Sequence, residues 1–354
     1  MAICEEVAPH WLAEARAIAE AAGVRAGLYT AYIGCVYRSL FLGDECTSYA
    51  VSKDYTKDGA ILFHKNRDNK QKPQAACIVA ADVRGVNKFI TVTDASVLAC
   101  MMMVNAKGLA GSADTGGAVG VGTPKYRGMM NTFVLRHIAE RAESCHDALD
   151  IIKRFVEKGW YAGGGGTGTH WLFVDKKGHI LEVSNNADKV VAQYHDEKVY
   201  FSVRGDTPAA DALRQSASPI DFQLFHNVSR DPSICFDGTI AGMTVEIDPE
   251  FPGQLTCAWI SFPASAMAFP LFLANESTAA PLVDGTVDRL CRGLKAPSNF
   301  SEKADAWIHA SRLAVATEAR ALLRQGKTQE ATEFLNEWTR HAFKNQMILL
   351  EGLS

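Results

Sequence analysis

The sequence has no apolar run that approaches the ~20 residues a membrane-spanning helix needs. Its N-terminus is rich in Glu and Ala and lacks the charged and then apolar segments of a secretory signal. A net charge of -4 leaves no basic excess for contacts with nucleic acid. These absences favour a cytoplasmic protein that binds neither a membrane nor nucleic acid.

Cysteine pairs of the Cys-x-x-Cys type are absent, and the nine cysteines are irregularly spaced. Neither a disulfide framework nor a zinc ribbon is therefore indicated. The histidines show no metal-ligand spacing with Cys, Asp or Glu, so we expect no metal and no other cofactor. With the exception of Cys46, we interpret most cysteines as small buried hydrophobic residues: Cys4, Cys35, Cys77, Cys100, Cys145, Cys235, Cys257 and Cys291.

A glycine run at 163–168 is the one feature similar to a phosphate loop. The run lacks the Gly-Lys-Ser/Thr sequence, and an apolar strand pattern follows it, so no helix N-terminus stands behind the loop. We interpret the run as an active-site loop, with a plain linker as the alternative. His170 follows the run, where it either lines a substrate pocket or packs as an ordinary side chain.

The 354 residues are 47% hydrophobic, enough to bury a large core in one domain or two. Pro9 and Gly23 bracket a helical pattern within residues 1–45, and Ser144 with Asp147 begins the second helix of a central pair. Residues 301–325 and 328–351 predict a C-terminal helical hairpin broken at Gly326. Period-two patterns predict strands at 46–52, 61–64, 76–81, 89–93, 99–105, 169–174, 180–184, 199–203, 239–247 and 255–262.

Cys46 begins the first of these strands, and an Asp-Gly pair at 58–59 predicts a tight hairpin into the next one. That return strand ends in Lys65-Asn66-Arg67-Asp68, which places Lys65 and Asp68 near the thiol. The alternative interpretation is a cysteine that merely starts a buried strand, followed by a solvated polar turn. A third motif, Asn-Ala-Lys-Gly-Leu, begins at Asn105.

The three motifs, in this order, resemble the N-terminal nucleophile hydrolases, in the branch of bile-salt hydrolases, penicillin acyltransferases and Cys-type dipeptidases. The likeness extends to about residue 295 and includes the hairpin at 169–182 and a strand entry at 238–243. It implies an α+β fold with four layers, αββα. Residues 1–45 would be a helical prosegment, and residues 46–354 the catalytic domain, with a helical hairpin at 301–351.

The resemblance also implies autocatalytic cleavage between Glu45 and Cys46. The freed α-amino group, with a pKa of ~7.7–8.0, would serve as the base for the Cys46 thiol. Asp68 would orient the α-ammonium, and Lys65 would lower the pKa of the thiol. The implied partners are a small-molecule amide and the cleaved chain 1–45, which would be retained on the large chain. A homo-oligomer is a further possibility.

Several positions depart from the family pattern. Counting from Gly-Leu places Asp114 where the family has the Asn that donates to the oxyanion. Either Asp114 is protonated, or backbone N–H groups of 111–117 donate, or another donor is used. Lys65 replaces the Arg of bile-salt hydrolases. For a second missing Asn the candidates are Arg204, Asn185 and Asn186, each otherwise a turn residue; the remaining substrate-binding candidates are Asn66, Asn105 and His170.

The sequence therefore predicts a Cys-dependent amide hydrolase or acyltransferase that acts on a linear C–N bond through a thioester on Cys46. Acyl transfer to an amine is one alternative to hydrolysis. An uncleaved, non-catalytic binding or scaffolding module is another, motivated by Asp114 and by the acidic Glu45 before the scissile bond. Nucleotide binding by the glycine run is a third.

Overall fold

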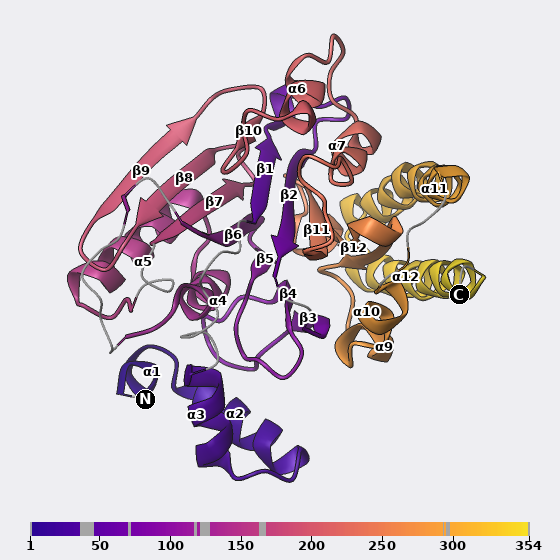
Figure 1. The fold of residues 1–354 in the computed structure, drawn as a ribbon. Coiled ribbons are helices and arrows are strands. Elements are labelled where there is room, and N and C mark those ends of the chain that lie inside the picture. Colours follow the sequence, from indigo (N-terminus) through magenta and orange to yellow (C-terminus); the bar gives the residue numbers. More distant parts are fainter. Residues whose placement is uncertain are drawn as a thin grey trace.

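The computed structural model describes residues 2–35, 46–69, 72–116, 119–120, 128–162, 168–292, 294 and 298–352. Two antiparallel sheets form the centre (Figure 1). The first has the order β10-β1-β2-β11-β12-β13, with bounds β10 Tyr200–Phe201, β1 Thr47–Val51, β2 Ile61–Asp68, β11 Thr239–Ile247, β12 Cys257–Phe262 and β13 Met267–Phe272. The second runs in sequence order: β3 Gln74–Val79, β4 Phe89–Asp94, β5 Met102–Asn105, β6 Leu109–Thr115, β7 Thr169–Asp175, β8 Ile180–Asn185 and β9 Val190–His195.

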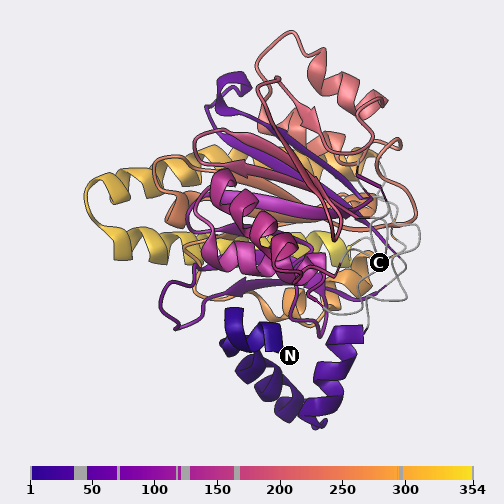
Figure 2. The ribbon, with the colours of Figure 1, turned by 90° about the vertical axis from the view of Figure 1, so that its left-hand side faces the viewer.

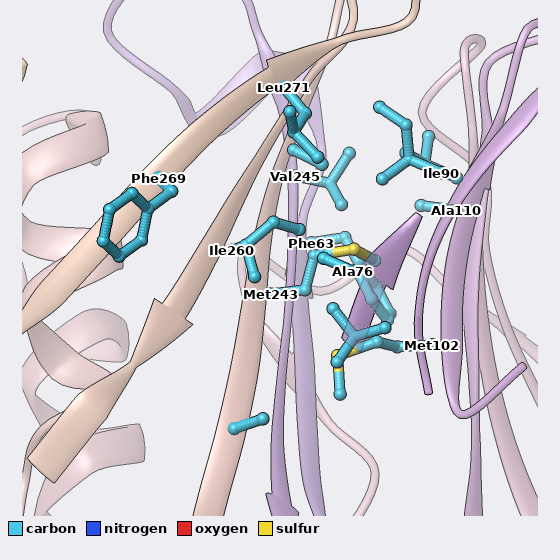
Figure 3. Packing of buried hydrophobic residues seen from close by; sticks show 14 of the residues in the cluster. Phe63, Ala76, Ile90, Met102, Ala110, Met243, Val245, Ile260, Phe269 and Leu271 are labelled. Atoms are coloured by element: carbon cyan, nitrogen blue, oxygen red, sulfur yellow. The ribbon is translucent and has the colours of Figure 1, made fainter. Parts of the chain in front are cut away.

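The two sheets pack face to face through an apolar layer (Figure 3). Phe63 of β2 and Met243 of β11 point from the first sheet toward Met102 of β5 and Ala110 of β6. Side chains alternate between the faces of a strand, so central strands such as β2 and β11 send every second residue into this layer. That alternation decides which polar residues face the interior of the sandwich.

Helices cover both outer faces. Helices α4 (Asn131–Arg141) and α5 (Cys145–Glu157) pack on the second sheet, where Phe155 lies in one core cluster with Trp171. The first sheet is covered by α6 (Pro208–Arg214), α7 (Phe222–Val228), α11 (Ser298–Arg324) and α12 (Thr328–Glu351), and Leu335 of α12 lies in one core cluster with Trp259 of β12. Short helices complete the chain: α8 (Pro252–Leu255), α9 (Ala280–Val283), α10 (Thr286–Cys291) and the 3-10 turns Lys53–Tyr55 and Pro263–Ser265.

The N-terminal helices α1 (Ala2–Val7), α2 (Pro9–Ala21) and α3 (Ala26–Cys35) lie together at one end of the sandwich (Figure 2). Trp11 of α2 donates its indole N–H to Glu140 of α4 at 2.8 Å. Arg136 of α4 is paired with Glu140 at 3.0 Å and with Glu14 of α2 at 2.5 Å. A buried charged network therefore attaches this segment to α4.

The C-terminal hairpin is attached by a second set of charges. Three arginines on one side of α11, namely Arg312, Arg320 and Arg324, face three acids at the end of β11, namely Glu246, Asp248 and Glu250. Arg312 donates to Glu246 at 2.6 Å, and Arg324 pairs with Glu250 at 2.7 Å. We call this set the α11 ladder.

The four-layer αββα fold, the N-terminal helices and the C-terminal hairpin are confirmed. The expected tight hairpin after the first strand is wrong: residues 52–60 include a 3-10 turn, so Gly59 only ends a wider loop. Strands β6, β9 and β13 and helices α6 and α7 were not predicted. None of the helices in the described part of the chain has the length and apolarity to cross a membrane. Cleavage into two chains stays a prediction.

Candidate active site

Cys46 lies immediately before β1 and is 7% exposed. It shares the inner face of the strand with Ser48 and Ala50, because side chains alternate. Burial raises the pKa of the Cys46 thiol. The charge of Lys65 and a hydrogen bond from the Asp68 main chain oppose that rise. Of the four motif residues at the end of β2, Lys65 and Asp68 thus lie near the thiol.

Asp68 ends β2 and is buried. The Thr239 hydroxyl donates to its Oδ1 at 2.6 Å. Its Oδ2 has no hydrogen-bond partner among the described residues and lies 4.0 Å from Arg204 Nη2. Burial raises the pKa of Asp68 to about 7, although the hydrogen bond from Thr239 and the charges of Arg204 and Lys65 oppose it. This carboxyl group therefore has one unsatisfied oxygen beside the nucleophile.

Lys65 and Asp114 form a buried ion pair with an Nζ to Oδ1 distance of 2.7 Å. Lys65 Nζ also donates to the carbonyl oxygens of Ala113 at 2.8 Å and Met101 at 3.1 Å. The ammonium group is thereby enclosed by three oxygen atoms. The structure thus places Lys65 near Cys46 in a buried pair with Asp114, and its catalytic role stays a prediction.

Asp114 Oδ2 accepts hydrogen bonds from two hydroxyl groups, those of Ser48 at 2.8 Å and Ser202 at 3.0 Å. Ser48 in turn shares a hydrogen bond with Ser112 at 2.8 Å. Every contact of this carboxylate is with a cation or a donor, so Asp114 acts as an acceptor.

Asn66 faces away from the thiol. Its Oδ1 is hydrogen-bonded to His64 at 2.8 Å, and its Nδ2 donates to the carbonyl oxygens of Ser229 at 2.7 Å and Ile234 at 2.9 Å. These contacts hold the segment after α7 against the outer face of the sheet. The structure gives Asn66 a structural position, and it does not join Cys46, Lys65 and Asp68.

Asn105 lies at the turn between β5 and β6, at the opposite end of β6 from Asp114. Its amide donates to the carbonyl oxygens of Ala139 and Ala142, and its Oδ1 accepts from the N–H groups of Lys107 and Leu109. All its hydrogen-bonding groups are thus used in closing the turn and holding α4.

His170 is the cross-strand neighbour of Asp114, which brings it to the inner face close to the site. Its imidazole is hydrogen-bonded to Glu182 at 2.5 Å. Glu182 also contacts His195 at 3.0 Å. Burial acts to raise the pKa of Glu182, but hydrogen bonds from His170, Tyr200 and His195 outweigh burial and lower this pKa to about 2. His170 therefore belongs to a satisfied cluster at the margin of the site.

Of the three candidates for the second missing Asn, the structure brings Arg204 to the site. Its guanidinium carbon lies 4.5 Å from the ring centroid of Phe236, and its backbone has a left-handed φ of 59°. Asn185 accepts the indole N–H of Trp171 on the opposite face. Asn186 caps the turn into β9.

Sequence reasoning missed Ser48, Ser112, Ser202 and Thr239. The period of two would have placed Ser48 on the same face as Cys46, whereas the other three reach the site only through tertiary packing. Glu45, Gly117 and residues 163–167 lie outside the described residues. In the described part of the chain, three or more His, Cys, Asp or Glu side chains never come together in a way that could hold a metal ion.

Residues 55–203 match the family model described as acyl-coenzyme A:6-aminopenicillanic acid acyl-transferase. The match covers less than half of the chain. It includes Lys65, Asp68 and Asp114 but begins after Cys46. The match confirms the resemblance that the motifs indicated. Among proteins with curated descriptions, none matches the chain.

Several solved structures are similar to this fold. They include a variant of conjugated bile acid hydrolase from Clostridium perfringens (12% identity, TM-score 0.43, covering 64% of this chain and 92% of the other). An N-acylethanolamine-hydrolyzing acid amidase ortholog of Caenorhabditis elegans has 11% identity and a TM-score of 0.42 over 58% and 94% of the two chains. Penicillin V acylase from Agrobacterium tumefaciens has 13% identity and a TM-score of 0.44 over 64% and 86%. These are distant likenesses, and no argument rests on them.

Proposed function

We propose that this protein, an amidohydrolase or acyltransferase of the N-terminal nucleophile type, cleaves a linear amide bond through a thioester on Cys46. The observation that carries this proposal is Asp68 Oδ2, which is buried beside the thiol with no hydrogen-bond donor among the described residues and with the Arg204 guanidinium only at 4.0 Å. A buried carboxylate oxygen that lacks a hydrogen-bond donor is costly. An α-ammonium group on Cys46 would satisfy it.

The proposed activation step creates that group. The Cys46 thiol attacks the Glu45 carbonyl carbon, the C–N bond breaks, and the thiol proton passes to the departing amine of Cys46. Water then hydrolyses the thioester, which releases the carboxylate of Glu45 and restores the thiol. The new α-amino group, with a pKa of ~7.7–8.0, accepts the thiol proton in each later turnover and returns it to the leaving amine.

We further propose that residues 1–45 stay bound after cleavage. The network of Trp11, Glu14, Arg136 and Glu140 supports this, and the Tyr29 hydroxyl donates to the Ser96 carbonyl oxygen at 2.8 Å. None of these contacts involves the scissile bond. A cleaved chain would therefore keep them.

For the substrate, we propose a small linear amide that meets Arg204 at the margin of the site. The Arg204 side chain is 21% exposed, and it stacks on Phe236 close to Asp68. Asn66 and Asn105 are occupied by structural hydrogen bonds. The choice between water and an amine as acyl acceptor would be read from the product ratio with and without an added amine.

Intact mass of the wild-type protein tests the proposal directly. We expect two chains that end at Glu45 and begin at Cys46, in place of one 38.4 kDa species. Cys46→Ala should abolish both cleavage and amidase activity, whereas Cys257→Ala, which alters another buried thiol, should leave both intact. Wild-type turnover in Cys46→Ala would identify another nucleophile. An uncleaved wild type without amidase activity would favour a binding module.

A further inference from the structure

Thr239 occupies a special position at the start of β11. The register between β2 and β11 shifts between Thr239 and Ala241, and the shifted pairing sets Thr239 opposite Asp68. Such irregularities often redirect a side chain near an active site. Thr239 is buried, at 6% exposure.

The contacts of the Thr239 hydroxyl determine where its proton points. The backbone N–H of Phe236 donates to Thr239 Oγ1 at 3.1 Å. The hydroxyl donates to Asp68 Oδ1 at 2.6 Å. The Cys235 side chain also lies within hydrogen-bonding reach of this hydroxyl. Because a hydroxyl group has one proton, the Phe236 N–H occupies an acceptor position and the carboxylate oxygen at 2.6 Å is a better acceptor than sulfur, the proton is directed to Asp68. The carboxyl group is thus held by one oxygen, and its other oxygen has no hydrogen-bond donor among the described residues and lies 4.0 Å from Arg204 Nη2.

We propose that Thr239 is a positioning residue for amide cleavage: it fixes Asp68 so that Oδ2 receives the α-ammonium of Cys46. This inference rests on the function proposed above. The segment that holds the hydroxyl also carries Phe236, on which Arg204 stacks. One short segment therefore orients both charged groups next to the nucleophile.

The hydrogen bond from Thr239 also favours the ionised form of Asp68. It opposes the rise in the pKa of Asp68 that burial causes. Without the hydroxyl that pKa would rise further, and Asp68 would lose its charge at a higher pH. The other groups that act on this carboxyl are Arg204, Lys65 and Asp114, and both thiols, Cys46 and Cys235, interact with its charge.

The test compares Thr239→Val, which keeps the shape but removes the hydroxyl, with Thr239→Ser, which keeps the hydroxyl. In the mature enzyme we expect the Val variant to move the acid limb of kcat/KM upward by roughly one pH unit. Activity on that limb would fall about tenfold, and the Ser variant would follow the wild type. Thr91→Val removes another buried hydroxyl, which donates to the Met102 carbonyl oxygen, and should leave the profile unchanged.

Cleavage is followed by intact mass in every sample, and Thr239→Ala replaces the Val variant if the latter does not fold. A cleaved, folded Val variant with the wild-type pH profile would overturn the role of Thr239 and leave the proposed function standing. Equal shifts in the Val and Ser variants would do the same. An uncleaved, inactive wild type would overturn the proposed function and this inference with it.

Discussion

Two clusters of charged side chains differ in whether all their carboxylate oxygens have hydrogen-bond partners. The cluster on α4 pairs Arg136 with Glu140 and Glu14, and Glu140 also accepts from Trp11 and His10. Both carboxylates in it are therefore satisfied. The cluster between the sheets pairs Lys65 with Asp114, but one oxygen of Asp68 has no hydrogen-bond partner among the described residues and only a 4.0 Å contact with Arg204.

We interpret the cluster on α4 as a structural contact between segments, and the cluster around Asp68 as part of the proposed active site. A satisfied network holds two segments together and gains nothing from another group. A cluster with one unsatisfied buried oxygen is costly as it stands, and it favours whatever cation is formed next to it. Variants in the α4 cluster should therefore lose stability or the contact between segments, whereas variants of Asp68 should lose turnover.

The largest effect should come from Asp68→Asn. Without the carboxylate the α-ammonium loses its proposed partner, so we expect kcat to fall roughly 10²–10⁴-fold while the folded protein remains. Asp175→Asn offers a matched control, because Asp175 is buried but accepts from N–H groups around the turn after β7 and the start of α5. It should lose stability and retain kcat. Wild-type kinetics in Asp68→Asn with a mature Cys46 terminus would make Asp68 a turn residue.

Asp114→Asn should come next, with a loss of about 3–5 kcal/mol in the free energy of unfolding, because it leaves the Lys65 ammonium buried and unpaired. In the double variant Lys65→Met/Asp114→Asn the unpaired charge is gone, so most of the stability should return while turnover stays low. Urea denaturation and steady-state kinetics measure the two quantities. If Asp114→Asn is as stable as the wild type and more active, the position accepts the usual family donor.

Arg136→Met tests the satisfied cluster. It removes charged hydrogen bonds to Glu140 and Glu14, so we expect a loss of about 2–3 kcal/mol and release of the cleaved N-terminal chain in native mass spectrometry. The exposed Arg154 on α5 gives the matched control, Arg154→Met, which should keep the two chains together. Retention of the small chain by Arg136→Met would show that other contacts hold it.

The smallest effect on turnover is expected for Asn105→Ala. The turn between β5 and β6 loses the four hydrogen bonds of the Asn105 side chain, which should cost about 2–5 kcal/mol in the free energy of unfolding. The kinetic parameters should not change, because Asn105 lies at the far end of β6 from Asp114. A lower kcat/KM at unchanged stability would indicate that Asn105 contacts the substrate after all.

Much of the nucleophile region could be predicted from the sequence because its parts lie on adjacent antiparallel strands. The pairing of Ser48 with Lys65 follows once a return strand is expected after Cys46. Asp114 was placed by counting within a motif, although its strand was not predicted. Thr239 could not be found this way, because it meets Asp68 from a distant part of the chain.

The missed strands have physical reasons. β13 contains Pro270, which argues against a central strand, and the structure tolerates it because β13 is an edge strand. β6 is rich in small residues with weak strand preference. β9 is also an edge strand, and its mostly exposed residues show no alternation. Asn66 and Asn105 were singled out by their motifs, and their structural contacts depend on neighbours that a sequence pattern does not reveal.

The α11 ladder gives the hairpin a graded response to ionic strength. The side-chain exposure of its arginines rises from 7% at Arg312 through 31% at Arg320 to 62% at Arg324. Salt screens exposed ion pairs strongly and buried pairs much less. Added salt therefore weakens the ladder first at Arg324, next to the turn between α11 and α12, while the pair between Arg312 and Glu246 keeps the hairpin on β11.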